Sequence, residues 1–178
     1  VVGDILSFLS VVVRKSDKFS WFSVLKLLPG IGGKNATDIS KHCNDPDFPE
    51  KYKKRKYYND LEEFLHCVNT YGTLNTDLSS LLSDIAEYYF LLRTAKAEKA
   101  RTASARYDAM ERITKEKDIV NVLIDMSRHY SSATEFLDDI ALDSLKTSTD
   151  GDRLVITTIH SAKGLEWPIT ILIDCVED

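Results

Sequence analysis

The spacing of apolar residues predicts a chain that is helical over most of its length. Between residues 2 and 14, apolar side chains recur every three or four positions, which is the period of an α-helix that buries one face. From Thr94 to Arg106 the chain is polar and rich in alanine, so we expect a solvated or flexible connection there. The same helical period occurs in three further stretches, of which 61–68 and 78–92 precede this polar connection and 107–140 follows it.

Two short helices are expected on either side of a glycine-rich turn. Residues Trp21–Leu28 are mostly apolar, and Ser20 before them is the expected N-cap. The proline and glycines of "LPGIGG" then break the helical pattern. Asn35 is the expected cap of a second helix over 36–42. The pattern predicts a helix, a tight turn and a second helix.

The pattern changes near the end of the chain. After the break "KTSTDGD", the stretches "RLVITTI" and "PITILID" are β-rich and flank a polar loop. Two strands are marginal alone, so we expect them to belong to a larger sheet. The fold class expected is therefore mainly α, with a helical domain over 1–146 and a β–loop–β piece of an α/β domain over 147–178.

Composition narrows the class of protein. The chain has 178 residues, of which 43% are hydrophobic, and this is enough for a compact core. No apolar run is long enough for a membrane span. The three cysteines form no CxxC pair, so we expect no disulfide framework, no metal site and a reducing, cytoplasmic environment. Because the first residue is Val1, we expect a piece of a longer protein.

Charge is distributed unevenly along the chain. Residues 1–60 hold 11 Lys and Arg against 7 Asp and Glu, whereas residues 135–178 hold 3 against 10. A surface that binds a polyanion should therefore lie in the first third of the chain.

The glycine-rich turn is a candidate phosphate site. Glycines expose backbone N–H groups, and the following helix N-terminus favours an anion. Lys34 adds a charge, and Ile31 can fill the angle between the two helices. The stretch "KLLPGIGGKNATDI" resembles a helix-hairpin-helix element, which grips a nucleic-acid backbone without reading bases. An ordinary helix–helix turn with glycine C-caps fits the same residues.

A basic run, "KYKKRK" (51–56), follows in the same third of the chain. It could add phosphate contacts, although such a run alone is more typical of a solvated loop. Tyr52, Tyr57 and Tyr58 could stack on bases or could equally pack on the protein body.

The polar loop between the two expected strands is the second candidate site. A strand would deliver Thr157, Thr158 and His160 to its carboxyl end, where ligands collect in parallel sheets. Hydroxyl, imidazole and backbone N–H groups suit a phosphate, whereas the Glu166 carboxylate suits ribose hydroxyls. Taken singly, each of these residues is more often structural.

The whole string "TTIHSAKGLEW" carries a stronger signal. It resembles motif V of superfamily 1 DNA helicases of the UvrD/Rep/PcrA type, whose form is close to T-x-H-x-[AS]-K-G-L-E-[FW]. The turn "LLPGIGGKNA" is similar to one in that family's helical 2B subdomain, which lies just before motif V in the 2A domain. The start, "GDILSFLSVV", looks like the helix that opens that subdomain.

The resemblance implies a fragment of an ATP-dependent 3′-to-5′ DNA helicase, whose parent protein would use ATP and Mg²⁺. It implies partners in single-stranded and duplex DNA, with repair or replication proteins as further partners. No Walker A, Walker B or final arginine motif occurs in the chain, so no catalytic residue is assigned and the fragment alone should be inactive. The roles implied are single-strand contact by Thr158, His160 and Lys163, nucleotide contact by Gly164 and Glu166, and duplex contact by Gly30, Ile31, Gly32, Gly33 and Lys34.

The alternative is a non-enzymatic module. A helix-hairpin-helix element can serve DNA binding or protein docking without any ATP-driven step. A Walker A string upstream of Val1 in the gene would decide for the helicase.

Overall fold

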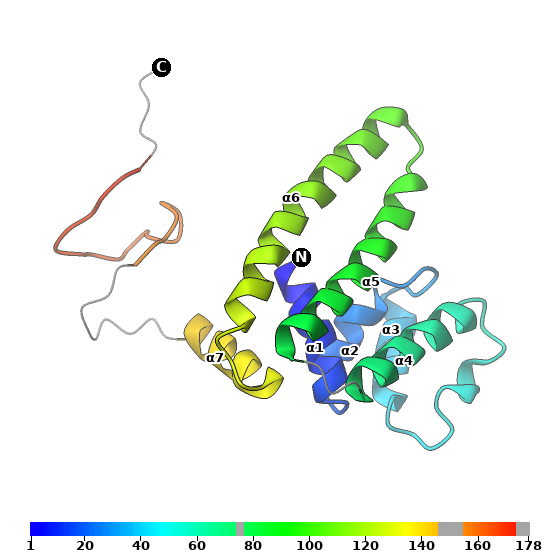
Figure 1. Cartoon of the computed structure of the whole chain (residues 1–178). Coiled ribbons are helices and arrows are strands. Elements are labelled where there is room, and N and C mark those ends of the chain that lie inside the picture. Colours follow the sequence, from blue (N-terminus) through cyan, green and yellow to red (C-terminus); the bar gives the residue numbers. More distant parts are fainter. Residues whose placement is uncertain (74–76, 146–154, 174–178) are drawn as a thin grey trace. The chain divides into compact units, whose positions relative to one another are not determined.

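The computed structural model describes residues 1–73, 77–145 and 155–173 (Figure 1). By its internal contacts the chain divides into a helical unit, Val1–Leu145, and a second unit, Lys146–Asp178. The described part of the second unit, residues 155–173, is called the C-terminal segment below.

The helical unit is built around its first helix. Helix α1 packs against α2, α4, α5, α6 and α7, and it can do so because apolar residues cover most of its surface. The expectation of a mainly helical fold is confirmed. The helices are α1 (Val2–Val13), α2 (Lys18–Leu25), α3 (Gly33–His42), α4 (Tyr58–Thr73), α5 (Leu78–Glu98), α6 (Ala103–Ser127) and α7 (Ala133–Leu145), with a short 3₁₀ helix η1 (Glu50–Tyr52) before α4.

Aromatic side chains form the centre of the core. The rings of Phe8 and Phe64 meet edge to face with centroids 5.3 Å apart, and Trp21 contacts Phe64 in the same way at 5.7 Å. Tyr88 of α5 packs on Phe8 at 5.7 Å. These pairs join α1, α2, α4 and α5, and each adds to the stabilisation from apolar burial.

Two helices begin earlier than the sequence predicts. Helix α2 begins at Lys18, and its cap is Asp17, whose carboxylate accepts hydrogen bonds from the N–H groups of Phe19 and Ser20 at 3.1 and 3.2 Å. The prediction of Ser20 as cap was wrong because an Asp three residues earlier competes for the same role. Helix α3 begins at Gly33 with Gly32 as its cap, so Asn35 lies inside its first turn.

The predicted flexible connection over 94–106 was also wrong. Helix α5 continues to Glu98, and α6 begins at Ala103 after Thr102, whose hydroxyl caps the helix. Alanine, lysine, glutamate and arginine favour helix even without an apolar stripe. The two helices lie side by side (Figure 1), and the Arg93 guanidinium joins both oxygens of Glu116 across them at 2.9 and 3.1 Å.

The C-terminal segment has no such core. Its described residues form a turn over 159–164 and otherwise irregular backbone, and none is assigned to a strand. The two expected strands, over 153–159 and 168–174, are therefore not confirmed, and their outermost residues lie outside the described ranges. Ile156 and Ile169 are 87% and 80% exposed.

Among the helices of the described residues, none combines the length and the hydropathy that a membrane crossing requires.

Candidate nucleic-acid interface

The glycine turn joins α2 to α3 through a left-handed residue. Gly30 has a φ of +73°, a conformation that side-chain-bearing residues adopt at a cost. Leu28 and Ile31 on either side are buried, and the Ile31 N–H donates to the Leu28 carbonyl at 3.3 Å. Ile31 therefore anchors the turn to the core, while Gly30 lets the chain reverse.

The N-terminus of α3 is open to solvent. Gly32 occupies the cap position, and no side chain caps the helix there. Gly32 and Gly33 are exposed, and a Cβ built on either residue would meet nothing within 4 Å. The first N–H groups of a helix have no intrahelical acceptor, and those of α3 belong to an exposed stretch that includes Lys34. This arrangement can accept an anion such as a backbone phosphate.

The basic run lies against this turn. A Cβ built on Gly30 would stand 3.6 Å from the Cβ of Tyr57. The Tyr52 hydroxyl donates to the Asp38 carboxylate of α3 at 3.1 Å, and burial together with Asp38 raises the pKa of Tyr52, which keeps this donor protonated. Sequence patterns did not reveal this contact, because no periodicity links residues on separate elements.

The three tyrosines around the basic run are part of the core. Tyr52, Tyr57 and Tyr58 are each less than a tenth exposed. Burial, together with hydrogen bonds to Glu50 and Glu62, raises the pKa of Tyr58 to about 12. Of the two alternatives left open by the sequence, packing on the protein body is therefore correct, and base stacking by these rings is excluded.

The second candidate site is a closed turn in the C-terminal segment. The Thr158 hydroxyl accepts from the Ser161 N–H at 3.2 Å and donates to the Ser161 hydroxyl at 3.0 Å. The Ala162 N–H donates to the Thr158 carbonyl at 2.9 Å. Thr158 thus organises the turn from within, a structural role that the sequence did not single out.

The polar side chains in and next to the turn form no ion pairs with one another. His160, Lys163 and Glu166 are exposed, and none of them has an ion pair within the described ranges. Gly164 ends the turn with a φ of +85°, and the Leu165 N–H donates back to the Ala162 carbonyl at 3.0 Å. The turn brings an imidazole, an ammonium and a carboxylate into one short exposed stretch.

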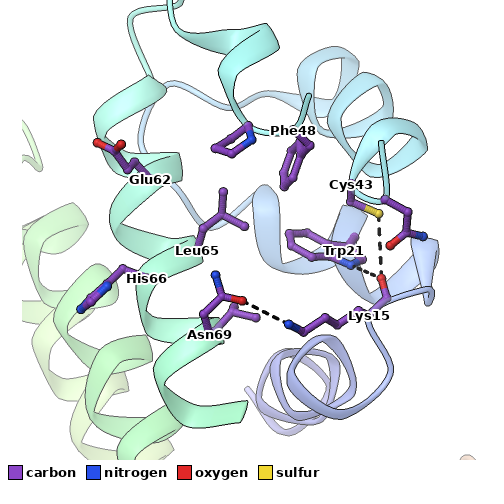
Figure 2. Close-up of a pocket in the computed structure, with 11 residues that line it drawn as sticks. Lys15, Trp21, Cys43, Phe48, Glu62, Leu65, His66 and Asn69 are labelled. Carbon is purple, nitrogen blue, oxygen red and sulfur yellow. Dashed lines mark hydrogen bonds between the residues drawn. The ribbon is translucent and has the colours of Figure 1, made fainter. Parts of the chain in front are cut away.

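A pocket of about 430 Å³ opens elsewhere, between α4 and the loop after α3 (Figure 2). Trp21, Phe48 and Leu65 contribute its apolar lining. At one end the Lys15 ammonium donates to the Asn69 side chain at 3.1 Å. The backbone carbonyl of Lys15 accepts a hydrogen bond from the Trp21 indole N–H at 2.8 Å. No sequence pattern predicted this pocket, because its lining comes from four separate stretches.

The cysteine in the lining of this pocket, Cys43, is not activated. Burial raises the pKa of the Cys43 thiol, which keeps it protonated and unreactive near neutral pH. In the part of the chain that the structure describes, no group of three histidines, cysteines or acids is placed to hold a metal ion. Cys175 lies outside the described residues.

Comparison with known proteins defines the class of this chain. The model of the UvrD-like helicase C-terminal domain family matches residues 1–178, so the chain belongs to that family. ATP-dependent DNA helicase srs2 of Schizosaccharomyces pombe is 24% identical over 202 residues, which cover 96% of this chain and 22% of that protein. ATP-dependent DNA helicase PcrA of Bacillus subtilis is 23% identical over 199 residues, which cover 99% of this chain and 26% of that protein.

The chain therefore spans about a quarter of the length of these two relatives. No solved structure matches it significantly.

Proposed function

We propose that this chain is the part of an ATP-dependent, 3′-to-5′ DNA helicase that holds the 2B subdomain, over 1–146, and the return into the 2A domain, over 147–178. The family match along all 178 residues carries the proposal. The described geometry supports it, because both candidate elements present polar groups to solvent. In this reading the parent protein unwinds DNA, and this chain supplies contacts to DNA and to the nucleotide.

The glycine turn is the proposed duplex contact. Gly30, Ile31 and Gly32 shape it, while Gly33 and Lys34 begin the uncapped helix α3. Backbone N–H groups and one ammonium would hold a phosphate by position and charge, without reading the base sequence. The buried Ile31 anchors the turn, so little conformational entropy would be lost when DNA binds.

The turn at 158–164 is the proposed coupling element. Thr158, His160 and Lys163 would face the single strand, and Gly164 and Glu166 would face the nucleotide. The exposed Glu166 carboxylate fits ribose hydroxyls, which are hydrogen-bond donors, and disfavours phosphates. ATP and Mg²⁺ would supply the hydrolytic chemistry in the parent protein, with phosphate and metal held by residues beyond those of this chain.

The duplex contact can be tested with one charge reversal. Binding of a fluorescent forked duplex to the purified chain is measured by anisotropy at several salt concentrations. Lys34→Glu should weaken binding and flatten its salt dependence, because a phosphate contact releases counterions. Lys99→Glu, an equal charge change at the exposed end of α5, is the control and should have a smaller effect. Equal effects of the two variants would contradict the proposal.

Two activity measurements separate the helicase from the binding module. We expect the purified chain alone to show no DNA-stimulated ATP hydrolysis, and measurable turnover would contradict that. The full-length protein should hydrolyse ATP when single-stranded DNA is added. A full-length protein that binds forks without any ATP hydrolysis would instead be the non-enzymatic helix-hairpin-helix module.

A further inference from the structure

The basic run 51–56 is held in a fixed position beside the glycine turn. Tyr52 within the run and Tyr57 directly after it are only 3% and 7% exposed, so the run is flanked by two residues that are anchored in the core. The Tyr52 hydroxyl donates a hydrogen bond to Asp38 of α3, and a Cβ built on Gly30 would stand 3.6 Å from the Cβ of Tyr57, so Tyr57 lies beside the glycine turn. Its position is therefore set by the same helix and the same turn that form the proposed duplex contact.

The backbone of the run is also folded. The Arg55 N–H donates to the Tyr52 carbonyl at 2.8 Å, and the Tyr58 N–H donates to the Arg55 carbonyl at 3.1 Å. Two successive tight turns thus carry the chain from η1 to α4. A prefolded loop loses less conformational entropy on binding than a free one, so its charges can act at a lower ordering cost.

The five cations of the run differ in their partners. Lys51 lies 3.8 Å from Asp45, and Lys53 lies 3.0 Å from Glu50. Lys54, Arg55 and Lys56 are exposed and have no ion pair among the described residues. These three consecutive residues, called the basic tip below, directly precede Tyr57, the residue that lies beside Gly30 of the glycine turn.

Three acids near the run already have partners. Asp38 accepts from Tyr52, and Glu50 accepts from Lys53 and Tyr58. Asp45 lies near Lys51 and His42. The carboxylates around the run are therefore partly compensated, while the charges of the basic tip are not.

We infer that the basic tip and the glycine turn form one surface that binds the backbone of double-stranded DNA, with the tip adding phosphate contacts beyond those of the turn. This inference rests on the proposed duplex contact. Three adjacent uncompensated cations fit a polyanion, and the guanidinium of Arg55 can bind two phosphate oxygens at once. Because the tip directly precedes the buried Tyr57, its position on the protein is fixed, and it would contact the duplex at a defined place.

The experiment removes the three charges and measures the salt dependence. The variant Lys54→Gln/Arg55→Gln/Lys56→Gln is compared with the unchanged chain on a forked duplex between about 50 and 200 mM salt. If each cation meets a phosphate, the slope of log K against log salt should shrink by about 2 to 3. Raising the salt over that range should then weaken binding of the variant by a factor that is roughly 15- to 60-fold smaller than for the unchanged chain.

The chain offers a matched control. Lys96, Lys99 and Arg101 are also two lysines and one arginine, and they are exposed around the α5–α6 connection. Their triple replacement by glutamine changes the net charge equally and should leave the slope nearly unchanged. Helical circular dichroism and the unfolding midpoint verify that both variants fold.

Each outcome decides between the claims. A slope lowered only in the tip variant supports the inference. Equal effects of the two triple variants would show a response to net charge alone and would overturn it. An unchanged slope in the tip variant, with binding still weakened by Lys34→Glu, would overturn the basic tip but leave the glycine turn in place. If neither the tip nor Lys34 matters, the proposed duplex contact itself fails.

Discussion

The helical unit and the C-terminal segment differ in two respects: how much of a core each has, and how specific its sequence pattern is. The helical unit has a complete core, with Phe64 fully buried, yet its sequence signals are mostly periodic and shared by many folds. The C-terminal segment carries the most specific string of the chain, Thr157–Trp167, yet Ile169 beside it is 80% exposed. The most specific sequence motif therefore does not lie among the residues that form the core.

The physical reason lies in what each region must satisfy. A core requires apolar side chains of suitable volume at a suitable period, and many sequences meet that requirement. A turn that binds DNA or a nucleotide, as proposed for the C-terminal segment, would require particular donors and acceptors at fixed positions and so would tolerate few alternatives. Hydrogen bonds within the turn fix its backbone, but they bury no apolar surface and cannot replace a core.

The largest contrast should appear in a pair of core-type substitutions. Phe64→Ala removes a ring that contacts both Phe8 and Trp21, and it should lower the free energy of unfolding by about 3 to 5 kcal/mol. Ile169→Ala removes an exposed side chain and should change it by less than about 0.5 kcal/mol. Urea denaturation followed by helical circular dichroism measures both. A comparable loss in the two variants would show that the segment packs on a core.

A pair of left-handed glycines gives the next contrast. Gly30→Ala keeps ordinary contact with Tyr57, so its cost comes from the positive φ and should reach about 1 to 2 kcal/mol in the unfolding of the helical unit. Gly164→Ala meets the same backbone penalty in a segment without tertiary contacts to the added Cβ. The same denaturation assay should find its midpoint unchanged, and a shift equal to that of Gly30→Ala would break the comparison.

Capping provides a third pair with the same local geometry. The Asp17 carboxylate and the Thr158 hydroxyl each accept a hydrogen bond from the N–H three residues later, at 3.2 Å in both cases. Asp17→Ala should lower the unfolding free energy of the helical unit by about 1 kcal/mol. Thr158→Ala should leave that free energy unchanged, because the turn that begins at Thr158 is not followed by a helix.

The Asp17 cap also predicts a response to acid. Burial alone would raise the pKa of Asp17, but hydrogen bonds from Ser20, Ser10 and Phe19 outweigh it and hold the pKa below its usual value. A carboxylate with a lowered pKa in the folded state stabilises the protein above about pH 4, and this contribution is lost as the pH falls further. Asp17→Asn keeps an acceptor without titrating, so its stability should fall less steeply in that range; an identical decline would contradict the assignment.

The sequence predicted much of the helical fold and less of its details. The apolar period located α1 to within a residue, since a buried face imposes a strict spacing. It failed over 94–106, where helix propensity and the Arg93–Glu116 pair extend α5 without an apolar stripe. It also chose Ser20 in place of Asp17, because both residue types cap helices and periodicity does not rank them.

The candidate sites show the same limit. The glycine turn could be located because glycine and proline interrupt helices wherever they occur. The position of the basic run beside the turn could not be predicted, because it depends on the hydrogen bond of Tyr52 to Asp38 and on the packing that brings Tyr57 next to Gly30. Local patterns predict elements, whereas the joining of elements into one surface is decided by tertiary packing.

The last contrast is read from fluorescence quenching and not from a free energy of unfolding, and it uses the two tryptophans as reporters. Trp21 lies in the helical unit and is 3% exposed, and Trp167 lies half-buried in the C-terminal segment. In the variant Trp167→Phe, the remaining Trp21 should resist quenching by acrylamide until urea unfolds the helices. In Trp21→Phe, the remaining Trp167 should be quenched readily at all urea concentrations, because no core shields it. Equal protection of both would mean that the segment folds with a core of its own, and the division between the two regions would then fail.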